Sequence, residues 1–433
     1  MANNTNEVKA EYFLDKKSHG VLGVTLSLTA TIFGASAVLG LMDEAAIKGL
    51  PATWLLLSGS FGFACLLFLL KKIDITNFHS ISEYFGSIFG EGYRKLSALL
   101  IALSWTAIIA AQLVAMGKVF SVILDLEFIY GVVLTASIIF FYTAAAGQRG
   151  VISTDKIQSI GIAAGLIYLC SLINPVVLKS AFNNPTTKDL FGFPVNSGFN
   201  YANLITMLIA AGVPYIIGPD IYSRMLVAKN KVVVYKSIVI SIFIITIIAF
   251  IIAIIGINFK LTMAGVKKDY IFFFFKSQPA VLKILFAVFV FCVIGSSADT
   301  CLMTASTLSI NDVFKVSSSG KRLVCFTRIA MLFIIITASV IAVRKPVIIK
   351  NLLLAYKIFS ISFLTPFVYN MIFDLKKNRI NAGVLFILNI AVLLVFFVLE
   401  YQSNKYSFIY SIVYYFILFY FCLILPRKTN AIP

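Results

Sequence analysis

The sixth apolar stretch, IAAGVPYIIGPDIYSR (residues 209–224), decides the fold, because it is apolar enough to lie in a membrane and is interrupted twice. Pro214 follows closely on Gly212, and Pro219 directly follows Gly218. Proline removes one hydrogen bond of a helix and leaves a carbonyl without its partner. In lipid, such freed backbone groups need another partner. The stretch is therefore either a kinked, closely packed helix or a helix that is broken around a binding site.

The first apolar stretch has an interruption of the same kind. It reads SLTATIFGASAVLG (residues 27–40), with Gly34, Ala35, Ser36 and Gly40 in its middle. Interrupted spans at matching places in two halves of a chain indicate the binding site of a transporter. The two stretches are five spans apart, which predicts two five-helix repeats of opposite topology.

The composition places the whole chain in a membrane. Hydrophobic residues make up 60% of the 433 residues and charged residues 12%, against about half and about a quarter in soluble domains. A helix needs about 20 apolar residues to cross a bilayer, and twelve such stretches occur, so we expect an all-α, multi-pass membrane protein with about twelve spans. They are residues 19–42, 51–70, 96–121, 128–146, 151–173, 199–218, 232–257, 280–310, 323–343, 351–374, 382–399 and 406–425.

Charge and cysteines narrow the function classes. The net charge is +18, and the positive-inside rule explains much of it without a nucleic-acid partner; both termini are expected on the cytoplasmic side of the cell membrane. The six cysteines lie in or beside apolar segments without CxxC spacing, so neither a disulfide framework nor a metal framework is expected. No GxSxG, Walker or HExxH pattern occurs, and we expect no enzyme and no cofactor.

The predicted organisation has no separate soluble domain. We expect a cytoplasmic tail (1–18), a first five-helix repeat (19–173), an extracytoplasmic loop (174–198), a second five-helix repeat (199–374), and two C-terminal helices with a short tail (375–433).

The eighth span carries many polar groups, in the sequence GSSADTCLMTASTLSINDVFK (295–315). Insertion of the Asp299 side chain at the centre of a membrane helix would cost about 2.5–3.5 kcal/mol. The polar face is therefore expected to contact other helices or a water-filled path. Hydroxyl groups there either hold a small hard cation together with freed carbonyls, or bond back to the helix and to its neighbours. The helical face consists of Ser296, Thr300, Thr304, Thr307 and Asn311.

Three further polar residues lie in or beside expected spans. Asp155 suits the beginning of a helix. Gln112 lies in the middle of a span and needs partners from a neighbouring helix or from a substrate. Lys357 lies inside the tenth span, where it extends towards the membrane surface or pairs with an acid or with an anionic group of a substrate.

Four stretches resemble motifs of the sodium:solute symporter family, whose core has the LeuT-type inverted repeat. EYFLDKKSHG (11–20) is similar to the family's YFLAGR segment, and STDKIQ (153–158) is similar to its TDxxQ motif. GPDIYSRMLVAKN (218–230) resembles the R-x-x-x-A-K segment, and SSADTCLMTASTLSINDVF (296–314) resembles the eighth-helix signature. All four occur in the order found in the family.

The resemblance implies a sodium site between the first and eighth core helices and places Asp155 on the ion's exit path. The implied ligands are the hydroxyls of Ser296 and Ser297 and the carbonyls of Ala30, Phe33 and Val293. The chain also departs from the family. The usual extra helix before the YFLAGR segment is absent, Ile32 stands where some members have an acid, and Gly218 stands where sugar carriers have an asparagine, which argues against a sugar.

We therefore expect a sodium-coupled importer of a small organic solute that works by alternating access. Lys357 favours an amino acid or a small carboxylate. The alternatives are a sensor with a transporter-like core, and proton coupling through Asp155 or Asp299. The expected partners are the solute, sodium and lipid, and the oligomeric state stays open. The expected substrate cavity contains Gly34, Ser36, Gln112, Tyr215, Gly218 and Lys357.

Overall fold

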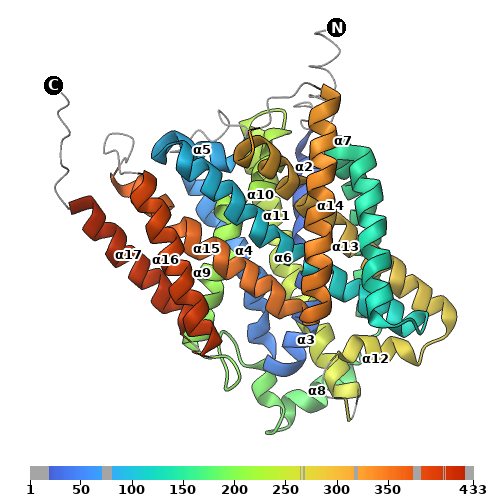
Figure 1. Ribbon diagram of the computed structural model, residues 1–433. Helices are drawn as coiled ribbons and strands as arrows, with labels where there is room; N and C mark the ends of the chain where they lie inside the picture. The colour runs from blue at the N-terminus through green and yellow to red at the C-terminus, as the bar shows by residue number, and fades with distance from the viewer. Residues whose placement is uncertain are drawn as a thin grey trace, which may run out of the picture.

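The computed structural model is helical almost throughout (Figure 1). It describes residues 19–70, 80–263, 265–266, 269–315, 320–373, 382–402, 404 and 406–424. The expected tail 1–18, and with it most of the YFLAGR-like segment, lies outside these residues. The first half of the chain forms α2 (Val21–Ile32), α3 (Ala35–Lys48), α4 (Trp54–Leu69), α5 (Ile81–Phe89), α6 (Glu91–Ile123), α7 (Phe128–Ser171) and α8 (Pro175–Asn183).

The second half repeats the pattern of long apolar helices. It forms α9 (Tyr201–Ile217), α10 (Pro219–Leu226), α11 (Lys231–Thr262), α12 (Tyr270–Lys276), α13 (Ala280–Leu308), α14 (Gly320–Arg344), α15 (Ile348–Phe373), α16 (Ala382–Tyr401) and α17 (Ser407–Ile424). Short turns flank some of them: η1 (Leu50–Thr53), η3 (Lys188–Phe191) and η4 (Ser309–Val313).

The expected membrane spans correspond to these helices. Among the described residues, nine helices are long and apolar enough to cross a membrane, and two bent pairs bring the number to eleven. The last expected stretch forms the shorter apolar helix α17. The chain is thus a multi-pass membrane protein.

Both expected interruptions are real breaks. Helices α2 and α3 meet at 54°, and the two residues between them, Phe33 and Gly34, are non-helical. In the sixth span α9 ends at Ile217, Gly218 is extended, and Pro219 begins α10. Proline has no N–H to donate and suits the first position of a helix, so the chain stops one helix and starts another at this point.

The fourth and fifth expected spans are two helical segments that meet at a kink. They share the label α7, and Gly147 between them is non-helical. Its φ of 61° and ψ of −164° lie in a region that is open to glycine and strained for other residues. The connection between the two spans is therefore very short.

The bundle has two distinct ends. Helix α5 lies at one end, here named the α5 face, whereas α8 and α12 lie at the other, the α8 face (Figure 1). At the α5 face the beginning of α2 is joined to the end of α10, because His19 N–H donates to Val227 O at 3.2 Å and Lys229 N–H donates to His19 O at 3.1 Å. The two broken spans are therefore tied together at this end.

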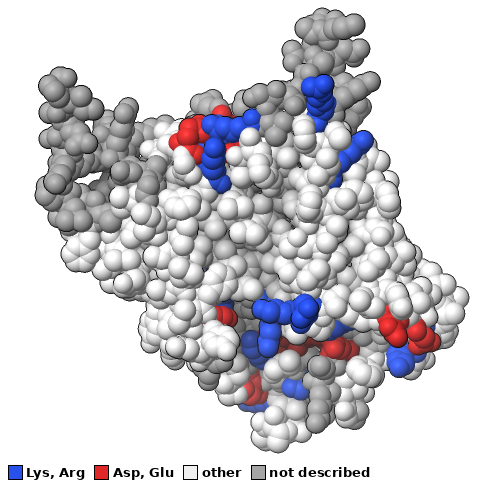
Figure 2. Space-filling view, viewed as in Figure 1, with Lys and Arg blue, Asp and Glu red and all other residues white. Residues whose placement is uncertain are grey.

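Burial separates central helices from peripheral ones. In the most apolar 18-residue stretch of α6, 89% of the residues are buried, whereas the corresponding value for α14 is 22%. Figure 2 shows an uncharged belt around the middle of the visible face, with acidic and basic residues gathered towards both ends. Large apolar side chains that are exposed, such as Phe333 of α14, can face lipid, whereas α6 forms the centre of the bundle.

A tight helix crossing gives the first prediction. A Cβ atom on Gly62 of α4 would lie 2.3 Å from the carbonyl oxygen of Gly212 in α9. We expect Gly62→Ala to force the helices apart and to lower the free energy of unfolding by about 1–3 kcal/mol, the usual cost of overpacking. Gly92→Ala is the matched control, because nothing lies within 4 Å of its added Cβ. Melting temperatures of both variants in detergent test this, and equal values would contradict it.

Candidate functional site

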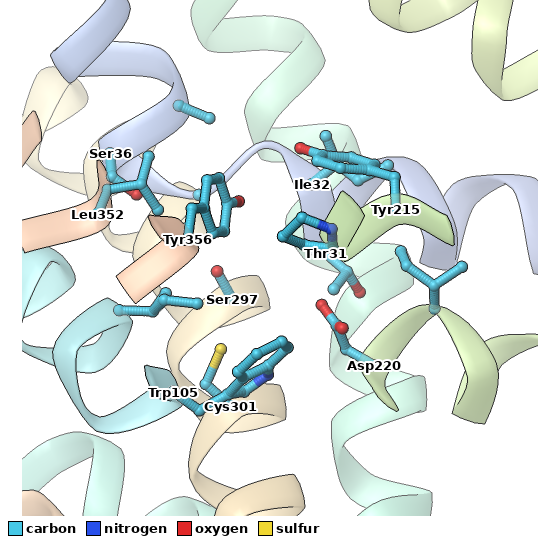
Figure 3. A pocket seen from close by; sticks show the side chains of 15 residues that line it. Thr31, Ile32, Ser36, Trp105, Tyr215, Asp220, Ser297, Cys301, Leu352 and Tyr356 are labelled. Atoms are coloured by element: carbon cyan, nitrogen blue, oxygen red, sulfur yellow. The ribbon is translucent and has the colours of Figure 1, made fainter. Parts of the chain in front are cut away.

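The two broken spans enclose a small cavity together with α6, α13 and α15 (Figure 3). Ser36 and Tyr215 come from the two breaks, and Trp105 and Tyr356 close the space from α6 and α15. The remaining lining residues are Thr31, Ile32, Gly34, Ala37, Ile108, Pro214, Asp220, Ile221, Ser297, Cys301 and Leu352. The cavity thus lies where the sequence predicts a transporter site, between the interrupted helices.

Next to the cavity, the eighth span contacts the break of the first. Ser296 Oγ donates to Ala30 O at 2.9 Å and to Val293 O at 3.1 Å. The regular hydrogen bonding of α2 ends where Phe33 N–H donates to Thr29 O. Of the five expected sodium ligands, Ser296 Oγ therefore lies within hydrogen-bond distance of two others, the carbonyl oxygens of Ala30 and Val293.

The other two expected ligands flank this group. Phe33 is the C-cap of α2, with φ −81° and ψ 53°, so its carbonyl departs from the helical direction. Ser297 lines the cavity, and a Cβ on Gly34 would lie only 2.8 Å from its Oγ. Carbonyl and hydroxyl oxygens form the donor set that hard cations prefer, so the residues present fit a sodium ion.

Gln112 of α6 fills the gap in the broken first span. Its Oε1 accepts from Ala35 N–H at 2.7 Å, and its Nε2 donates to Ser36 Oγ at 3.1 Å and to Ser297 Oγ at 3.4 Å. The side chain is fully buried and does not line the cavity among the residues described. Of the two interpretations of Gln112, the structure favours partners from neighbouring helices over contact with a substrate.

A buried ion pair lies between the cation-site residues and the α5 face. Asp155 Oδ2 accepts from Ser27 Oγ at 2.7 Å and from Arg224 Nη2 at 3.0 Å. Arg224 Nη2 also donates to Thr300 Oγ1 at 2.6 Å, and both charged side chains are fully buried. These contacts connect α2, α7, α10 and α13, so four core helices meet at one guanidinium group.

Asp155 is not a helix-start residue. It lies eight residues beyond the kink at Gly147, which is two turns inside the helix, and its carboxylate is used by Ser27 and Arg224. Arg224 was missed by the sequence reasoning. In the sequence, Arg224 is marked only as the arginine of the R-x-x-x-A-K segment. A motif of this kind does not show which residue the arginine contacts.

Asp299 adds a second buried carboxylate beside this network. Its Oδ1 accepts from the backbone N–H of Thr300 at 2.5 Å, and Thr300 Oγ1 lies 3.3 Å from the same oxygen. Asp155 Oδ1 accepts no hydrogen bond from the described residues, whereas Asp299 also interacts with the hydroxyl group of Tyr142. The two carboxylates therefore lie in one buried polar region of the core.

Comparison with known proteins identifies the family. A family model described as the sodium:solute symporter family matches residues 12–387. The chain belongs to the sodium:solute symporter family. Family members similar to it include the osmoregulated proline transporter OpuE of Bacillus subtilis (strain 168), 23% identical over 361 residues, with 77% of this chain and 72% of that protein covered.

Two other relatives are a sodium/proline symporter and a choline transporter. The sodium/proline symporter of Staphylococcus aureus is 23% identical over 372 residues, with 77% of this chain and 70% of the relative covered. The high-affinity choline transporter 1 of Drosophila melanogaster is 30% identical over 174 residues, which cover 38% of this chain and 27% of that one. The relatives are transporters rather than enzymes.

Solved structures establish the fold of this family member. A Na⁺-coupled sialic acid symporter matches with a TM-score of 0.73 at 16% identity, with 94% of this chain and 90% of that chain covered. Mhp1, a nucleobase-cation-symport-1 family transporter, matches with a TM-score of 0.61 at 12% identity, with 95% and 93% covered. The chain has the LeuT-type fold of two inverted five-helix repeats.

The expected cavity set needs three corrections. Gly34, Ser36 and Tyr215 line the cavity. Gln112 and Gly218 are not among the described residues that line it. Asp220, two residues beyond Gly218, lines the cavity instead. Gly218 itself is the extended residue at which α9 ends and α10 begins. The third correction concerns Lys357.

Lys357 faces away from the cavity. Its Nζ donates to Glu400 Oε1 of α16 at 3.2 Å and lies 5.9 Å from the centre of the Phe396 ring, whereas the preceding residue, Tyr356, lines the cavity. One residue turns a helix by about 100°, a consequence of its 3.6 residues per turn. Of the interpretations of Lys357, the structure supports pairing with an acid, here Glu400, and contradicts a place in the cavity wall.

This placement predicts a mild phenotype for Lys357→Met. The two members of the pair are 19% and 40% exposed, and partly exposed ion pairs contribute about 0–1 kcal/mol to stability. We expect a small change in melting temperature and the wild-type stabilisation by sodium. Glu400→Gln is the control and should behave in the same way. A loss of solute binding in Lys357→Met alone would return this lysine to the binding site.

Proposed function

We propose that the protein is a sodium-coupled symporter that imports a small organic solute by alternating access. The observation that carries this proposal is the hydroxyl of Ser296, which bonds to Ala30 O and Val293 O beside a break in the first span. Broken helices around a central site are typical of transporters that expose this site alternately to the two sides of the membrane. Membership in the symporter family supports the same conclusion.

In this proposal, sodium binds between α2 and α13. Its ligands are the carbonyls of Ala30, Phe33 and Val293 and the hydroxyls of Ser296 and Ser297. Arrival of the ion would turn the Ser296 hydroxyl proton away from the carbonyls, so that its lone pairs and theirs converge on the cation. Because two ligands come from the broken helix and the serines from α13, the bound ion favours the arrangement in which these helices are close.

Asp155 is proposed to lie on the ion's path to the cytoplasm. This assignment makes the α5 face cytoplasmic and the α8 face external, with both chain ends on the cytoplasmic side. A membrane potential of about 100 mV supplies about 2.3 kcal/mol per charge, and a tenfold sodium gradient adds about 1.4 kcal/mol. One sodium ion per neutral solute can thus raise the solute concentration inside the cell to roughly several hundred times that outside.

The test is transport by purified protein in vesicles with an imposed sodium gradient. Proline is the first solute to use, because two relatives are named for it, and choline is the second. Binding of ²²Na⁺ together with sodium-driven accumulation of either solute supports the proposal. Sodium-dependent binding without accumulation would indicate a sensor, and accumulation driven only by a pH gradient would indicate proton coupling. Absence of ²²Na⁺ binding would overturn the sodium site itself.

A further inference from the structure

We propose that the cavity selects a solute with a positively charged nitrogen and that Asp220 supplies the opposing charge. This inference rests on the proposed function, because it concerns the solute site of the same transporter. Asp220 is the second residue of α10 and points towards the cavity beside Thr31 (Figure 3). In the sequence, Asp220 is distinguished only by its place directly after Gly218-Pro219 at a helix break.

The charge of the cavity wall is the first argument. Within the part of the chain that the structure describes, Asp220 is the only charged residue among those that line the cavity. Lys357, the one basic residue that the sequence analysis placed inside a span, is paired with Glu400 on the outer side of α15. Arg224, one turn further along α10, acts electrostatically on Asp220, but its guanidinium group is paired with Asp155 and it does not line the cavity. Among the described residues, no basic side chain therefore faces Asp220 from the cavity wall, so a cationic solute would gain from entering and an anionic one would be repelled.

The aromatic walls are the second argument. Trp105, Tyr215 and Tyr356 come from three different helices and line the same space. Figure 3 shows the two tyrosine rings across from Trp105 and Asp220. The faces of aromatic rings attract ammonium groups, and several rings around one space are a usual means of binding quaternary and tertiary ammonium ions. Rings and carboxylate therefore favour the same kind of solute.

The helix ends give the third argument. Half-helix N-termini in broken spans can bind an anionic substrate group through their free N–H groups. Here the first N–H of α3, that of Ala35, donates to Gln112 Oε1. At the other break the first turn of α10 carries Asp220, which opposes the positive end of that helix. At the first break one N–H is thus already used by a side-chain oxygen, and at the second break a carboxylate of the chain itself lies in the first turn.

The simpler interpretation is that Asp220 only stabilises the N-terminus of α10. That role requires a carboxylate in the first turn but predicts no preference for the charge of a solute. The two interpretations therefore differ in a property that binding measurements can detect in the wild-type protein.

The experiment measures binding without transport. Trp54 and Trp105 are the only tryptophans of the chain, and Trp54 lies outside the cavity, with its indole N–H on Pro194 O. In a Trp54→Phe background, the fluorescence of Trp105 reports on the cavity in saturating sodium. We would compare choline with its neutral isostere 3,3-dimethylbutan-1-ol, and pyrrolidine with proline and with cyclopentanecarboxylate.

We expect the cationic member of at least one set to bind at least tenfold more tightly than its neutral or anionic counterpart. Asp220→Asn should remove this preference, whereas Asp220→Glu should keep it at reduced affinity. If Asp220→Asn does not fold, the wild-type series still decides. Binding of neutral or anionic members alone, or of no cationic member at millimolar concentration, would overturn the inference.

The outcomes also separate this inference from the proposed function. A preference for cations without sodium-driven accumulation would leave the solute class correct and make the protein a sensor. Sodium-driven accumulation of a solute without any such preference would leave the symporter correct and remove the role of Asp220.

Discussion

Replacement of Asp155 by asparagine is expected to lower the free energy of unfolding by about 3–5 kcal/mol, the usual cost of removing one partner of a buried ion pair. The cost arises because Arg224 remains fully buried without its counter-charge. Sodium-driven uptake should fall as well, because the same carboxylate lies on the proposed ion path. Melting temperature and ²²Na⁺ uptake of the purified variant measure the two effects separately.

The second half of this experiment is a rescue. Asp155→Asn combined with Arg224→Gln removes both charges, and we expect it to recover most of the stability but not the uptake. Asp312→Asn is the matched control at another ion pair, because it also removes the acid. Arg94 Nη2 lies 2.6 Å from Asp312 Oδ1, and the arginine that remains is 24% exposed, so water can reach it and the cost should be smaller. A wild-type melting temperature for Asp155→Asn would show that the pair does not stabilise the fold.

Replacement of both Ser296 and Ser297 by alanine is expected to raise the sodium concentration for half-maximal binding at least tenfold. Loss of a partner for buried polar groups costs about 1–3 kcal/mol, and each 1.4 kcal/mol corresponds to a factor of ten in affinity. The variant loses the two hydroxyl ligands and also the bonds from Ser296 Oγ to Ala30 O and Val293 O. Titration of sodium against thermal stability provides the measurement.

Ser306→Ala is the control for the serine pair. Ser306 is buried in the same helix, but its Oγ donates to Met303 O of its own helix at 2.9 Å. We expect this variant to keep the wild-type dependence on sodium. An unchanged dependence in the double variant would mean that the ion does not bind at these serines.

The sequence by itself determined the membrane class, the positions of the spans and the two broken helices. Each of these depends on local properties, which are the length of an apolar run and the missing N–H of Pro214 and Pro219. The sequence also indicated Ser296 and Ser297 as polar groups that cannot face lipid. No contact between distant segments is needed for any of these conclusions.

The tertiary structure alone decided which side chains meet. Gln112 reaches the break between α2 and α3 from α6, and Arg224 reaches Asp155 across 69 positions of sequence. Helical periodicity gives the relative directions of side chains on one helix, but the rotation of that helix against its neighbours depends on packing. For this reason the sequence could not decide the direction of Lys357, a polar residue inside a span. In the structure Lys357 pairs with Glu400, whereas Tyr356, one position earlier, lines the cavity.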